Sequence, residues 1–198
     1  MPKIVDHDLY RKELLNKCFD LFAQKGYASI TMRQIAKELG VSTGTLYHYF
    51  PNKKSLFEHL VEEMVQQEIA IATADWKTLT TRQQRAEALG KYLLCNLDYH
   101  IKSSYLMIDF SQHQDSQGYV DSPFWLRLCE RYQSVIYEFL GLEDRALADF
   151  MMCFVDGVIL ERLLGNDRVD VVEQCTLMGK MISAYLEKYG YEKPEPGN

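Results

Sequence analysis

Apolar residues recur along most of the chain at the three- and four-residue spacing of amphipathic helices, and the alternation typical of strands is nearly absent. Near the N-terminus, Leu15, Cys18, Phe19 and Phe22 form one such stripe. Glycine, proline and N-cap residues divide this pattern into segments. The sequence therefore predicts an all-α protein of about nine helices, at residues 8–25, 31–39, 43–50, 53–74, 81–102, 103–113, 123–140, 143–164 and 170–189.

Two of these helices are short and lie close together in the segment 31–50. Thr31 and Gln34 have the spacing of a capping box, Gly40 can adopt the positive φ of a tight turn, and Ser42 caps the second short helix. Two short helices joined by a three-residue turn are typical of a helix-turn-helix, whose second helix enters the major groove of DNA. The outer face of that second helix is polar, with Thr43, Thr45, Tyr47, His48 and Tyr49.

The distribution of charge supports a nucleic-acid partner, although the whole chain carries a net charge of −6. Residues 1–60 have a net charge of +3, and residues 61–198 have −9. A basic N-terminal third joined to an acidic body indicates that only the first part contacts a polyanion.

Several classes of protein are disfavoured. The apolar runs are too short for a membrane span and no signal peptide is recognisable, so we expect a cytoplasmic protein without a membrane partner. The five cysteines are odd in number and lack a C-x-x-C pair, which favours reduced, mostly buried thiols over a disulfide or zinc framework, with redox sensing as the alternative. Phosphate-binding loops and hydrolase motifs are absent, so we expect no enzyme, cofactor or metal.

The segment from Leu14 to Leu60 resembles the TetR family of transcriptional regulators. The resemblance rests on Phe-x-x-x-Gly-Tyr ending at Tyr27, Thr-x-x-x-Ile-Ala beginning at Thr31, Gly-Val-Ser-x-Gly-x-Leu-Tyr-x-Tyr-Phe over residues 40–50, and Asn-Lys-Lys-x-Leu over residues 52–56. One departure is Tyr49, where many members have histidine.

The resemblance implies phosphate contacts by Tyr47 and Lys53 and close approach of DNA at Gly44. The full set of implied DNA-binding residues is Arg33, Thr43, Gly44, Thr45, Tyr47, His48, Tyr49 and Lys53. Packing roles for Tyr47 and Tyr49, an ordinary surface role for His48 and a pure capping role for Thr31 remain open alternatives.

The rest of the chain resembles the family's ligand-binding and dimerisation region only in length and helical character. The predicted pocket, for an unknown small hydrophobic or aromatic ligand, comprises Tyr92, Cys95, Tyr99, Met107, Phe110, Phe124, Trp125, Leu128, Tyr132 and Met152. The predicted dimer interface comprises Leu147, Phe154, Val158, Val171, Cys175, Met178, Ile182 and Tyr185. Both sets could instead be intramolecular core.

These observations predict a helix-turn-helix domain at residues 1–52, a connecting helix at 53–74, a ligand-binding and dimerisation domain at 75–190, and a tail at 191–198. The expected function is that of a homodimeric repressor on a palindromic double-stranded DNA operator, released by a small molecule. The alternative is a DNA-binding protein of the same fold that is regulated by a protein partner.

Overall fold

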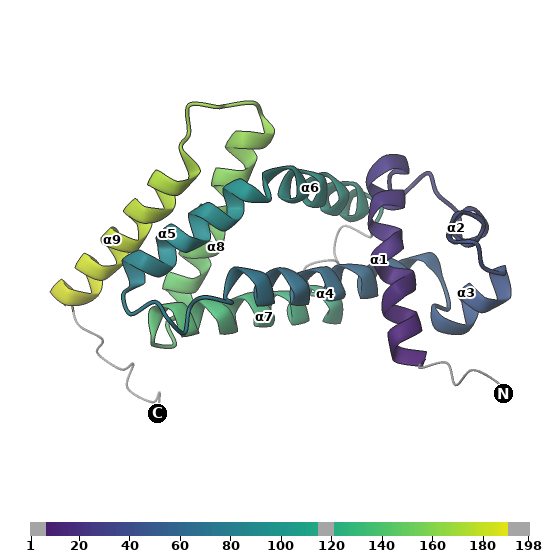
Figure 1. Cartoon of the computed structure of the whole chain (residues 1–198), viewed down its shortest axis with the longest axis horizontal. Helices are drawn as coiled ribbons and strands as arrows, with labels where there is room; N and C mark the ends of the chain where they lie inside the picture. The colour runs from purple at the N-terminus through teal and green to yellow at the C-terminus, as the bar shows by residue number, and fades with distance from the viewer. Residues whose placement is uncertain (1–6, 115–120, 190–198) are drawn as a thin grey trace. The chain divides into compact units, whose positions relative to one another are not determined.

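The computed structural model describes residues 7–114 and 121–189, and within these ranges the secondary structure is helical (Figure 1). The helices are α1 (His7–Lys25), α2 (Met32–Leu39), α3 (Thr43–Tyr49), α4 (Lys53–Ala72), α5 (Arg82–Cys95), α6 (Leu97–Gln112), α7 (Pro123–Leu140), α8 (Arg145–Leu163) and α9 (Val171–Tyr189). None of them is long and apolar enough to cross a membrane. The predicted all-α class is confirmed.

The predicted boundary between the fifth and sixth helices is wrong. We expected a helix from 81 to 102, but α5 ends at Cys95 and α6 starts at Leu97. The break lies at Asn96, whose side-chain amide donates to the carbonyl of Tyr92 at 2.9 Å. An asparagine side chain that bonds nearby backbone competes with the helical hydrogen bonds, which explains a break without glycine or proline.

The chain forms two compact units, and each is assembled from separated stretches of sequence. Unit 1 contains residues 1–69 and 102–131, and unit 2 contains residues 70–101 and 132–198. The helix-turn-helix therefore shares its unit with the second part of α6 and the first part of α7.

An aromatic cluster forms the centre of unit 1. Phe57 of α4 packs against Phe22, Tyr27 and Phe110 with ring centroids at 5.4, 5.1 and 4.2 Å. Phe110 of α6 also contacts Phe124 of α7 at 6.0 Å. Four of these rings are at most 2% exposed, and Tyr27 is 7% exposed. On α4, Phe57 is fully buried, whereas Met64 and Ile69 are half-buried.

Unit 2 is held together by close packing of α5 on α9 (Figure 1). A Cβ atom at Gly90 would approach the backbone of Val172 to 2.8 Å, and one at Gly179 would approach Cβ of Ala86 to 2.6 Å. Glycine is required at both positions because a side chain would push the two helices apart. Gly179 therefore permits the close approach of α9 to α5 within the protomer.

Candidate nucleic-acid interface

Local hydrogen bonds that the sequence predicts cap the start of α2 and shape the turn between α2 and α3. Gln34 N–H donates to the Thr31 hydroxyl at 3.3 Å, and Thr31 N–H donates to Gln34 Oε1 at 2.9 Å. Gly40 has a φ of 70° in the left-handed region, and Thr45 N–H donates to Ser42 Oγ at 2.9 Å. The capping box, the glycine turn and the serine cap are therefore confirmed.

Helix α3 presents a polar outer face above one apolar anchor. Leu46 is fully buried, whereas Tyr47 is 48% exposed and His48 is also exposed. A Cβ atom at Gly44 would meet only Ser42 Oγ, at 3.7 Å, so no neighbour within the protein requires glycine there. The bare backbone at Gly44 leaves room for an external partner to approach the helix.

Tyr49 has a different environment from its neighbours on α3. Its hydroxyl is hydrogen-bonded to Nδ1 of His7 at 2.9 Å, and its ring lies 5.6 Å from that of Tyr10 on α1. The ring of His48 stands edge-on to it at 5.0 Å. Tyr49 is half-buried and supports His48, in keeping with the packing alternative. His7 was missed because its partner lies 42 residues away and no local pattern marks it.

The remaining predicted DNA-binding residues lie on the same unit. Arg33 on α2 is exposed, and Thr43 and Thr45 on α3 are half-buried. The Thr45 hydroxyl lies 2.8 Å from Ser42 Oγ, which uses part of its hydrogen-bonding capacity.

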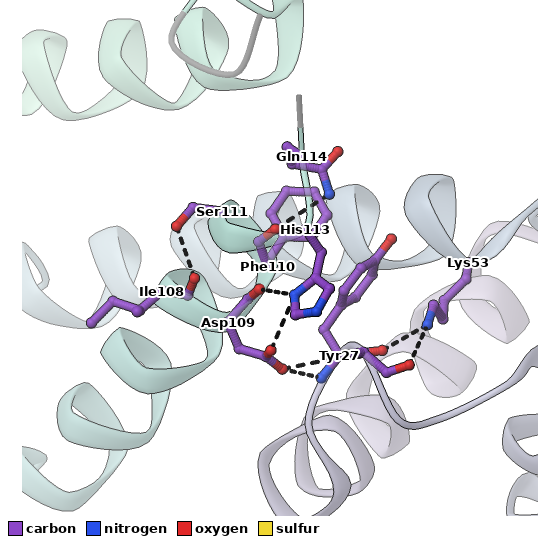
Figure 2. A network of polar contacts seen from close by, with 9 residues as sticks. Tyr27, Lys53, Ile108, Asp109, Phe110, Ser111, His113 and Gln114 are labelled. Atoms are coloured by element: carbon purple, nitrogen blue, oxygen red, sulfur yellow. Dashed lines mark hydrogen bonds and ion pairs between the residues drawn. The ribbon is translucent and has the colours of Figure 1, made fainter. Parts of the chain in front are cut away.

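Lys53, the predicted phosphate ligand, is half-buried at the start of α4. Its ammonium donates to the carbonyls of Tyr27 at 2.7 Å and Ala28 at 3.2 Å, and lies 4.5 Å from the centre of the Tyr27 ring (Figure 2). Burial lowers the pKa of Lys53, and the nearby charge of Asp109 opposes this shift. Since an ammonium has three donors, one remains available for a phosphate.

Residues 14–60 match the family model described as bacterial regulatory proteins, tetR family. Over 192 residues the chain is 25% identical to the HTH-type transcriptional regulator BetI of Brucella canis. The alignment covers 94% of this chain and 96% of BetI. The chain is a TetR-family transcriptional regulator. The TetR-family protein is thus a DNA-binding transcription regulator and not an enzyme.

Solved structures share the fold of this TetR-family protein. FadR from Bacillus subtilis, crystallised with stearoyl-CoA, superposes with a TM-score of 0.66 at 17% identity, covering 86% of this chain and 96% of that one. A transcriptional regulator from Saccharomonospora viridis, crystallised with choline, has a TM-score of 0.60 at 19% identity and covers 92% of this chain and 98% of that one.

The residues predicted to line a ligand pocket are divided between the two units. Phe110, Phe124 and Leu128 are at most 4% exposed and belong to the packed core of unit 1. In unit 2, the rings of Tyr92 and Tyr99 each lie 5.5 Å from that of His100. Cys95 is exposed. The remaining predicted pocket residues are half-buried, namely Met107, Trp125, Tyr132 and Met152.

Titratable groups in the cores are held in their neutral forms. Burial lowers the pKa of His100 to about 4 and raises the pKa of the Cys18 and Cys175 thiols to about 12. Cys18 and Cys175 are buried as predicted, whereas Cys129 is half-buried and Cys95 and Cys153 are exposed. Across the described ranges, no group of three or more His, Cys, Asp or Glu residues could hold a metal ion.

Most of the predicted dimer-interface residues lie inside the protomer. Five are at most 7% exposed and form the core between α5, α8 and α9: Val158, Val171, Cys175, Met178 and Ile182. Leu147 and Phe154 are half-buried, and only Tyr185 is exposed. Other apolar side chains of α8 and α9 face outward with at least 46% of their surface exposed, namely Phe150, Leu160, Leu177 and Met181.

Proposed function

We propose that the protein is a homodimeric repressor whose α3 enters the major groove of a palindromic operator. The observation that carries this proposal is the outer face of α3, where Tyr47 and His48 are exposed beside the bare backbone of Gly44. Tyr47 donates to a phosphate, and His48 reads a base edge with Tyr49 as its support. Because the proposed partner is DNA, we place the protein in the cytoplasm.

Conservative changes on α3 distinguish these two roles. Tyr47→Phe removes one phosphate hydrogen bond and is expected to weaken binding about fivefold on all sequences. His48→Ala is expected to relax the preference at one or two base positions. The probe is a duplex that the wild-type protein selects from a random-sequence pool, and affinity is measured by fluorescence anisotropy at two salt concentrations.

Tyr105→Phe is the matched control, because Tyr105 is 57% exposed on α6 and lies outside the helix-turn-helix. Its affinity should equal that of the wild-type protein. If the wild-type protein selects no duplex, or if both α3 variants bind like this control, the proposed DNA contacts are contradicted.

We further propose that a small molecule with an apolar part releases the operator. Two relatives of the same fold were crystallised with choline and with stearoyl-CoA, which supports control by small organic ligands. Addition of the effector to the protein–DNA complex is expected to raise the Kd about 5- to 150-fold, the usual range of allosteric coupling. Quaternary ammonium compounds and acyl-CoA thioesters are the first ligands to titrate, with anisotropy of the selected duplex as the readout. If no small molecule changes the Kd, regulation by a protein partner is the better hypothesis.

We also propose that α8 and α9 form the dimer contact through their outward apolar side chains. A self-complementary contact would bury Phe150 and Leu160 of α8 together with Met181 and Tyr185 of α9. This set replaces the predicted residues that the protomer core already encloses. Gly157 on α8 has open space around it, so a partner helix can approach closely there.

A further inference from the structure

The turn that follows α1 is held from two sides by opposite charges (Figure 2). On one side, Asp109 of α6 accepts hydrogen bonds on Oδ2 from the backbone N–H of Tyr27 at 2.6 Å and of Ala28 at 3.4 Å. On the other side, Lys53 of α4 donates to the carbonyls of the same two residues. Three elements that are distant in the sequence therefore meet at one short turn.

The two sides are linked through a rigid peptide plane. The carbonyl of Tyr27 and the N–H of Ala28 belong to one planar trans peptide and point in opposite directions. Asp109 binds the N–H end of this plane, and Lys53 binds its carbonyl end. Asp109 therefore fixes the orientation of this peptide plane, and that orientation sets the position of the Tyr27 carbonyl oxygen to which the Lys53 ammonium donates.

Asp109 is placed tightly enough for this role. Gly26 has a φ of 75°, and a Cβ atom there would lie 3.0 Å from Asp109 Oδ2, so the carboxylate sits directly on the turn. The second carboxylate oxygen of Asp109 lies 3.4 Å from Nδ1 of His113, which also bonds the Asp109 carbonyl at 2.7 Å. The carboxylate is thus hydrogen-bonded to the turn through Oδ2, while Oδ1 lies beside the imidazole of His113.

We propose that Asp109 is a positioning residue for DNA binding, which acts through the Tyr27–Ala28 peptide to hold Lys53 toward a DNA phosphate. This inference rests on the proposed function. Asp109 itself touches no DNA, and its negative charge alone would repel the polyanion. A positioning role and a charge effect therefore predict opposite results when the carboxylate is neutralised.

The test compares Asp109→Asn with Asp20→Asn, the same chemical change at an exposed position of α1 in the same unit. Asp20→Asn should bind the selected duplex as tightly as wild type or slightly more tightly, because a negative charge is lost. Asp109→Asn should bind about 10-fold more weakly. A plot of the logarithm of the association constant against the logarithm of the salt concentration has a negative slope, and Asp109→Asn should make this slope less steep by about one. That change is the signature of one lost phosphate contact.

A double variant identifies the path. In a Lys53→Met background, Asp109→Asn should cause no further loss of affinity, because the residue it positions is gone. The inference is overturned if Asp109→Asn binds like Asp20→Asn, or if its full loss persists without Lys53. It is also overturned if affinity falls with an unchanged salt slope and a lower urea midpoint, since that pattern marks a purely structural role. If the wild-type protein selects no duplex, the proposed function itself fails. The other outcomes leave the proposed function in place and overturn only the role of Asp109.

Discussion

Replacing Phe57 by alanine is expected to lower the free energy of unfolding by about 3–5 kcal/mol. Phe57 is fully buried and contacts rings from α1, from the turn after it and from α6. Its removal leaves a cavity that these rings cannot fill, because their positions are fixed by separate helices. Urea unfolding followed by circular dichroism measures the loss.

Leu126→Ala is the control, since Leu126 lies in the same unit on α7 but is 49% exposed. A change within about 0.5 kcal/mol is expected there. Phe57→Leu should fall between the two, because it restores part of the lost volume. A loss below about 1 kcal/mol for Phe57→Ala would show that the aromatic cluster does not hold unit 1 together.

A variant with aspartate at both Leu160 and Met181 is expected to be monomeric and to bind the selected duplex about 100-fold or more weakly than wild type. Both side chains are at least half exposed in the protomer, so the substitutions leave its core intact. In a twofold dimer each new carboxylate enters the interface twice and would be desolvated. DNA affinity falls because two linked recognition helices bind with an effective concentration that a monomer lacks. Sedimentation equilibrium and anisotropy measure the two effects.

Leu94→Asp serves as the control, because Leu94 is 45% exposed in the same unit but lies on α5. This variant should remain dimeric and retain its DNA affinity. The proposed interface is wrong if the Leu160 and Met181 variant still sediments as a dimer, or if the Leu94 variant dissociates as readily.

The helix-turn-helix could be predicted because its signals are local. Thr31 and Gln34 cap α2 across three residues, and Gly40 and Ser42 shape the turn without any distant partner. The break at Asn96 was missed for a related reason. Apolar residues continue on both sides of it at helical spacing, and an asparagine is a weaker breaker than proline or glycine.

Contacts between distant segments had no signal in the sequence. The bond between Asp109 and Tyr27 spans 82 residues, and aspartate on a helix is usually a solvated side chain. The stripes on α8 and α9 had the correct helical period, but a period does not say whether a face meets its own chain or a partner. Burial assigned Cys175 and Met178 to the protomer and left Met181 and Tyr185 outside.

Unit 1 is formed by two separated stretches of sequence, and this arrangement affects when the unit can fold during synthesis on the ribosome. The ribosome synthesises Phe57 several seconds before Phe110, at about 5–20 residues per second. Until α6 is synthesised, the helix-turn-helix segment lacks the ring that covers Phe57 and the carboxylate that caps the turn at Tyr27. The nascent N-terminal segment is therefore an incomplete folding unit, and a DNA-binding surface held in its final form arises only after more than half of the chain has been translated.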